Sequence, residues 1–140
     1  MEKVYVNQLI LSAMKACEKA YSPYSNFKVG AAIITDDFKI YEGFNIEFAA
    51  YSLCNCAERT ALFRAVYDGH KKFKAIAVVG KKSTDNNFSI YCPPCGMCRQ
   101  ALREFCNPKD LKIILAKSVD DYKIYTLEDL LPESFGSDKL

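Results

Sequence analysis

Histidine is almost absent from this 140-residue chain, in which His70 is the only residue of its type. A single histidine excludes a histidine-rich zinc site and any repeated histidine-based triad. His70 lies in a polar stretch at residues 68–71, and we expect it to be exposed and chemically inert. Any metal chemistry must therefore depend on other residue types.

Long apolar runs are absent too. No apolar stretch approaches the roughly 20 residues that a membrane-spanning helix needs, although half of the residues are hydrophobic. We therefore expect a real core and no contact with a membrane. The first 22 residues lack the basic-then-apolar order and the small-residue cleavage site of a secretory signal. We expect them to form a helix of a cytoplasmic domain.

The chain also lacks a strong excess of either charge, since its formal net charge is +2. A nucleic-acid polymer normally requires a stronger basic face, so we expect no such partner. Short lysine clusters occur at residues 71–74 and 81–82. We interpret both clusters as a solvated rim.

Cysteine, in contrast, is abundant, with seven residues. The odd number and the missing secretory signal argue against a disulfide framework and favour metal binding or catalysis in a reducing compartment. Cys17 and Cys106 lie on apolar faces of expected helices, so we interpret them as small core residues. The five other cysteines are candidates for chemistry: Cys54, Cys56, Cys92, Cys95 and Cys98.

The hydrophobic pattern predicts alternating helices and strands within a single domain, residues 1–140. We expect helices over residues 3–21, 57–67 and 95–105, a hairpin of 27–35 with 38–45, and strands over 74–80, 111–116 and 122–125. Thr126 and Asp129 predict a capping box before a last short helix. This order implies an α/β domain with a parallel or mixed central sheet and helices on its faces.

The sequence Cys-Gly-Met-Cys at residues 95–98 is the first metal-binding motif. Two residues three apart share one face of a helix, and Pro94 places Cys95 and Cys98 in the first helical turn. The unpaired N–H groups and the partial positive charge of a helix start favour the thiolate form. Two thiolates are not enough, however, because a catalytic zinc takes three protein ligands and one water.

Cys56 is the best third ligand for one zinc ion per chain, because it also begins a helix. Glu58 follows two residues later, and the irregular backbone of a helix start would let it reach the open coordination position. Three thiolates give the centre a net charge of −1, so Arg59 could donate to the sulfurs; an ordinary surface ion pair is the alternative. A closed four-cysteine structural site that includes Cys54 or Cys92 is a further alternative.

Several segments together resemble a known family. Cys-Ala-Glu at 56–58 and Pro-Cys-x-x-Cys at 94–98 are similar to the signature of zinc-dependent deaminases. With Gly-Phe-Asn-Ile-Glu at 43–47 and Cys-Asn-Cys-Ala-Glu-Arg-Thr-Ala at 54–61, they resemble the small homotetrameric cytidine deaminases over nearly the whole chain. A cysteine at position 56, where deaminases of nucleotides and polynucleotides usually have histidine, favours the branch that acts on free nucleosides.

The resemblance implies a fold and an activity. The fold is a three-layer α-β-α sandwich around a mixed five-stranded sheet. The activity is zinc-dependent hydrolytic deamination of cytidine and 2′-deoxycytidine to uridine and 2′-deoxyuridine, with a role in pyrimidine salvage. Glu58 would be the catalytic residue that moves protons from water to ring atom N3 and to the leaving amine.

The resemblance also implies substrate contacts. Asn45 and Glu47 would hold the ribose hydroxyls, and Phe27 would lie against the pyrimidine ring. The backbone N–H of Ala57 could bind the base carbonyl oxygen. From the residues alone, ordinary loop positions are the alternative for Asn45 and Glu47, and a core position is the safer interpretation of Phe27.

Further expectations concern neighbouring subunits and other substrates. Phe135 would reach into a neighbouring subunit's site in the homotetramer, with Tyr51 near that border. Pro93 stands where relatives usually have serine or threonine, but it keeps the carbonyl that would accept a hydrogen bond from the substrate amino group. A blasticidin-type deaminase and a non-catalytic zinc-binding module are the alternatives, and the Asn-x-Glu segment argues against the former.

Overall fold

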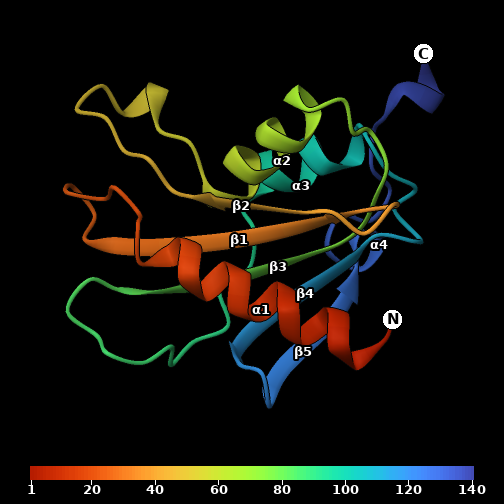
Figure 1. Ribbon diagram of the computed structural model, residues 1–140. Helices are drawn as coiled ribbons and strands as arrows, with labels where there is room; N and C mark the ends of the chain where they lie inside the picture. The colour runs from red at the N-terminus through yellow and green to blue at the C-terminus, as the bar shows by residue number, and fades with distance from the viewer.

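The computed structural model describes residues 1–140 and is built around one five-stranded sheet. Along the chain the elements are α1 (Lys3–Cys17), β1 (Phe27–Thr35), β2 (Ile40–Phe44), α2 (Ala57–Tyr67), β3 (Phe73–Lys82), α3 (Gly96–Arg103), β4 (Lys112–Ser118), β5 (Asp121–Thr126) and α4 (Leu127–Leu130). The strand order is β2-β1-β3-β4-β5, and only β3 and β4 pair in parallel (Figure 1). The predicted mixed sheet is confirmed.

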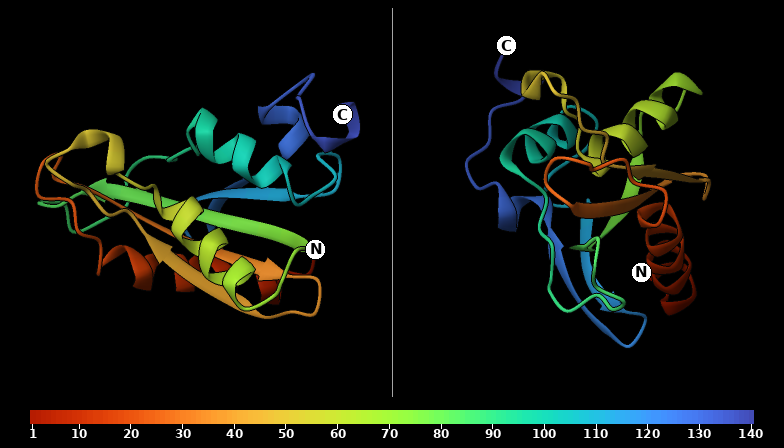
Figure 2. Two further views of the ribbon diagram at one scale, coloured as in Figure 1. Left: turned by 90° about the horizontal axis from the view of Figure 1, so that it is seen from above. Right: turned by 90° about the vertical axis from the view of Figure 1, so that its left-hand side faces the viewer.

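The two faces of the sheet bury alternate residues of the same strands, as the pleat requires. In β1, Ala32 and Ile34 face α1, whereas Ala31 and Ile33 face the core beneath α2. Helix α1 therefore covers one face, and α2, α3 and α4 lie on the other (Figure 2). This arrangement confirms the three-layer sandwich. The longest helix, α1, has 15 residues, and none of the helices combines the length and apolar character of a membrane span.

Several element boundaries differ from the sequence-based expectations; α3, for example, spans Gly96–Arg103 rather than residues 95–105. Helix α1 ends at Cys17 rather than at residue 21, because Tyr21 instead forms a bridge with Ile46. Strand β2 begins only at Ile40, because Phe38 has a φ of 66° in the preceding turn. The capping box of Thr126 and Asp129 at the start of α4 is confirmed, with both hydrogen bonds present.

Two expectations about exposed residues were wrong. Lys81 is buried, with 8% of its surface exposed, and its ammonium lies 2.6 Å from the Glu18 carboxylate. The expectation that this lysine is exposed to solvent is therefore wrong, because the end of α1 packs beside the end of β3. His70 is also partly buried, with Nδ1 3.6 Å from the carboxylate of Asp37.

Helix α2 lies unusually close to strand β2, and Gly43 makes this possible. A Cβ atom at Gly43 would lie 2.3 Å from the backbone nitrogen of Ala61 and 2.5 Å from the carbonyl oxygen of Ala57. Only a residue without a side chain fits there. The first turns of α2 are therefore held directly against β2, which fixes the position of the helix start.

Candidate metal centre and active site

Three thiol groups meet at the starts of two helices. Cys56 is the N-cap residue of α2, Cys95 is the N-cap residue of α3, and Cys98 lies in the first turn of α3. The Sγ atoms of Cys56 and Cys95 are 3.6 Å apart, those of Cys95 and Cys98 are 3.5 Å apart, and all three lie within 4.8 Å of one another. Neither N-cap side chain accepts a capping hydrogen bond from the backbone of its own helix.

These separations fit one zinc ion. Zn–S bonds of about 2.3 Å in a tetrahedral arrangement place the sulfurs about 3.8 Å apart. Neither Cys54 nor Cys92 belongs to this cluster. The Cys54 thiol instead accepts a hydrogen bond from the backbone N–H of Phe48 at 3.3 Å. The structure thus gives a three-cysteine donor set and no support for a closed four-cysteine site.

The surroundings of Cys56 favour its ionised form. Hydrogen bonds from Cys98, Arg59 and Cys95 lower the pKa of the Cys56 thiol to about 5, against a burial effect that raises it. The Nη2 atom of Arg59 lies 3.6 Å from the Cys56 sulfur. Because the thiolate is the form that binds metals, Cys56 is readily available as a ligand for an ion.

Glu58 is a buried carboxyl group in the first turn of α2. It is 3% exposed, and its Oε1 atom has no hydrogen-bond partner. Burial raises the pKa of Glu58 to about 7, so the group can gain or lose a proton near neutral pH. A buried polar atom without a partner is costly. Its place beside three thiols fits a site that keeps one coordination position open for a reacting molecule.

A small cavity adjoins this cluster, and we call it the site cavity. Its volume is about 210 Å³, and it is lined by Val29, Asn45, Glu47, Cys54, Asn55, Cys56, Glu58, Cys92, Pro93 and Cys95. Ligand pockets commonly measure roughly 300–1,000 Å³. The site cavity is therefore smaller than the usual pocket for a small-molecule ligand.

Asn45 and Glu47 line the site cavity and also organise its wall. The Asn45 amide accepts from the N–H of Val29 and donates to the carbonyl of Phe27, both at 2.9 Å. The Glu47 carboxylate accepts hydrogen bonds from the backbone N–H groups of residues 24–25 and from the Ser25 hydroxyl. One N–H of the amide and part of the carboxylate remain free for a ligand. Their role as ribose contacts stays a prediction.

The other residues expected at the substrate lie in different positions. Phe27 does not line the cavity, but its ring and the sulfur of the lining residue Cys92 both lie close to Gly80, where a Cβ atom would meet them at 3.0 Å and 2.8 Å. Ala57 is buried between Cys56 and Glu58 and does not line the cavity.

Tyr51 and Phe135, at 72% and 58% exposed, also lie outside the site cavity of the single chain. Sequence reasoning missed Asn55 and Val29 as lining residues. Asn55 could have been suspected from its place beside Cys56. No sequence pattern indicated Val29, because only the pairing of its strand within the sheet brings it to the cavity.

Comparison with known proteins supports the interpretation of this geometry. A family model described as the cytidine and deoxycytidylate deaminase zinc-binding region matches residues 5–114. A cytidine deaminase from Sporosarcina psychrophila is 47% identical over 96% of this chain and 94% of its own length. A second, from Halalkalibacterium halodurans, is 45% identical over 94% of this chain and 95% of its own length.

Solved structures agree with these relatives. A cytidine deaminase from Burkholderia pseudomallei has a TM-score of 0.81 and 48% identity, over 91% of this chain and 97% of that one. A cytidine deaminase from Mycobacterium tuberculosis has a TM-score of 0.78 and 35% identity, over 93% and 96%. With the three-thiol cluster and the buried carboxyl in place, the chain belongs to the cytidine and deoxycytidylate deaminase family.

Proposed function

We propose that this chain hydrolyses the amino group of free cytidine and 2′-deoxycytidine, giving uridine or 2′-deoxyuridine and ammonia. The observation that carries the proposal is the buried Glu58 carboxyl, with one unpaired oxygen, beside the sulfurs of Cys56, Cys95 and Cys98. The relatives named cytidine deaminase match the chain along nearly its whole length and support this substrate class.

Cys56, Cys95 and Cys98 would hold one Zn²⁺ ion per chain. When bound, the ion would supply Lewis acidity that makes water a nucleophile near neutral pH. Arg59 would withdraw charge from the Cys56 thiolate, from 3.6 Å away. The starts of α2 and α3 would act in the same direction through their N–H groups.

Glu58 would be the proton carrier of the reaction. It would take a proton from the attacking water, give it to ring atom N3, and then deliver the second water proton to the departing amine. One group does both when its pKa lies close to the working pH, and burial raises the pKa of Glu58 into that range. The balance is one nucleoside and one water consumed, with one oxo-nucleoside and one ammonia formed.

The walls of the site cavity would orient the nucleoside. Asn45 and Glu47 would bind ribose hydroxyls with the capacity that their backbone contacts leave free. The carbonyl of Pro93 would accept from the substrate amino group, and Phe27 would pack against the base. The N–H of Ala57 would bind the base carbonyl oxygen.

We further propose a homotetramer with shared sites, acting in pyrimidine salvage in the cytoplasm. Large aromatic side chains remain exposed on the single chain, among them Tyr51, Phe63, Tyr67 and Phe135. Surfaces of this kind commonly mark protein–protein contacts. If Phe135 and Tyr51 complete a neighbour's pocket, dilution to monomers abolishes activity, whereas a fully active monomer contradicts shared sites.

The direct test is an ultraviolet assay with cytidine, 2′-deoxycytidine and adenosine, combined with a zinc count per chain. We expect turnover of the two cytosine nucleosides, none of adenosine, and one zinc per chain. Bound zinc with no ammonia from any nucleoside would instead support a non-catalytic zinc module. Turnover of blasticidin without turnover of cytidine would move the assignment to the antibiotic deaminases.

A further inference from the structure

The last nine residues, 132–140, form a segment that we call the C-terminal arm. Apolar burial does not hold this arm in place. Gly136 is its only buried residue, whereas Phe135 is 58% and Leu140 is 96% exposed. The arm borders a polar cavity of about 670 Å³. Its position must therefore come from polar contacts with the rest of the chain.

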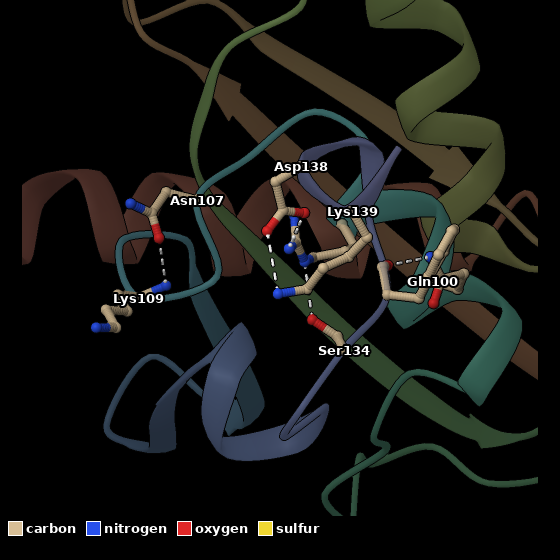
Figure 3. A network of polar contacts seen from close by, with 8 residues as sticks. Gln100, Asn107, Lys109, Ser134, Asp138 and Lys139 are labelled. Carbon is tan, nitrogen blue, oxygen red and sulfur yellow. Dashed lines mark hydrogen bonds and ion pairs between the residues drawn. The ribbon is translucent and has the colours of Figure 1, made fainter.

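Those contacts come from helix α3 (Figure 3). Arg103 is 11% exposed, and its Nε atom donates to the Ser134 hydroxyl at 2.8 Å while Nη2 donates to the Asp138 carboxylate at 2.8 Å. Gln100 donates from Nε2 to the carbonyl oxygen of Phe135 at 2.9 Å. One guanidinium thus holds the arm on both sides of Phe135.

Gly136 shows how closely the arm and the guanidinium approach. A Cβ atom at this position would lie 2.5 Å from Nη1 and 2.6 Å from Cζ of Arg103. Real Cβ atoms do not approach other atoms so closely. The arm backbone therefore packs directly against the guanidinium group of Arg103. The interaction is a close contact rather than a long-range ion pair.

The same helix begins at the thiol cluster, with Cys95 as its N-cap residue and Cys98 in its first turn. Because Arg103 belongs to this helix, its contacts with the arm also fix where the arm lies relative to the metal ligands of the same chain. The backbone of Phe135 is fixed while its ring stays exposed. Because the backbone of Phe135 is already held, little further conformational entropy is lost when a partner covers the side chain.

We propose that Arg103 is a positioning residue that locks the C-terminal arm onto α3 and thereby presents Phe135, ready ordered, to the site of a second copy of this chain. This inference rests on the proposed function, in which Phe135 serves a neighbouring site. It adds that the affinity for nucleoside depends on a guanidinium that touches neither substrate nor metal.

The kinetic test compares Arg103→Ala, Phe135→Ala and the double variant with the wild-type zinc enzyme, using cytidine. An aromatic contact is worth roughly a two- to twelvefold change in binding. We therefore expect KM to rise up to about tenfold in Phe135→Ala and by no more than that in Arg103→Ala, with kcat within about threefold of wild type. The double variant should be no worse than Phe135→Ala, because both act through one contact. Losses that multiply, or an unchanged KM in Arg103→Ala, overturn the proposal.

Matched variants separate this role from general stability. Lys109→Ala removes a positive charge that lines the same polar cavity but forms no side-chain hydrogen bond or ion pair with the arm, and we expect wild-type KM. Gly136→Ala keeps Arg103 yet pushes the guanidinium away, and we expect it to raise KM as Arg103→Ala does. A KM change in Lys109→Ala equal to that in Arg103→Ala contradicts a specific lock.

A readout independent of activity distinguishes failure of the lock from failure of the proposed function. The chain contains no tryptophan, so Phe135→Trp places a single tryptophan on the arm, whose fluorescence can be excited selectively over that of the tyrosines. Fluorescence anisotropy should fall when Arg103→Ala is added to this variant and should not fall when Lys109→Ala is added. Unchanged anisotropy refutes the lock even in an active enzyme, and absent cytidine turnover in the wild type refutes the function alone.

Discussion

Replacing Gly43 with alanine tests whether the approach of α2 to β2 places Cys56, the proposed metal ligand. The new Cβ atom would lie 2.3 Å from the nitrogen of Ala61, 2.5 Å from the carbonyl oxygen of Ala57 and 2.5 Å from the Thr60 hydroxyl. Two of these atoms belong to the helix backbone, so no change of rotamer relieves the contact. Carbon atoms pack at about 3.5–4 Å, and the helix and the strand must therefore separate by about 1 Å.

A separation of this size acts directly on the site. If α2 moves, Cys56 moves away from Cys95, whose sulfur is now 3.6 Å distant. If β2 moves, it shifts Asn45, which follows the strand and lines the site cavity. Misplacement by about 1 Å can cost roughly 10²-fold in rate, and overpacking costs about 1–3 kcal/mol in stability. We expect Gly43→Ala to remain folded and to lose about 10²-fold in kcat/KM.

The assay combines kcat/KM for cytidine, zinc per chain and the unfolding temperature. Gly96→Ala is the matched control, because a Cβ atom at Gly96 meets nothing within 4 Å. We expect this control to keep zinc and activity. Wild-type kcat/KM in Gly43→Ala would refute the argument that this contact places the ligands.

Three further predictions concern the site and its support. Glu58→Gln should keep zinc and the fold but lose at least roughly 10²-fold in kcat, because an amide neither accepts nor releases a proton near neutral pH; unchanged kcat removes Glu58 from its role. A strong chelator should abolish deamination, and added Zn²⁺ should restore it; activity that survives complete zinc removal contradicts the metal assignment. The hydrogen bond from Lys81 lowers the pKa of Glu18, so its contribution to stability is present above the ordinary Glu pKa and is lost as the pH falls through the lower, folded-state pKa. Glu18→Gln should cost about 1 kcal/mol at neutral pH and should flatten the acid limb of a plot of unfolding temperature against pH; a parallel curve for the variant contradicts this.

Much of the fold could be predicted from sequence because its cues are local. Apolar periodicity predicted α2 to the residue, and the spacing of Thr126 and Asp129 predicted the capping box of α4. The end of α1 and the burial of Lys81 were mispredicted. Both depend on contacts between segments distant in sequence, the bridge of Tyr21 to Ile46 and the pairing of Lys81 with Glu18.

The sequence by itself determined the chemistry of the site. Three cysteines at helix starts, with a glutamate two residues after the first, predict a zinc donor set and a proton carrier, because thiolate stabilisation and helix capping act over a few residues. Tertiary structure alone decided that Cys56 and Cys95, which are far apart in sequence, lie 3.6 Å from each other. It also decided that Glu58 is buried with one free oxygen, and that Arg103 holds the arm carrying Phe135. Such features depend on how α2 and α3 pack on the sheet, which is a property of the whole fold rather than of any local segment.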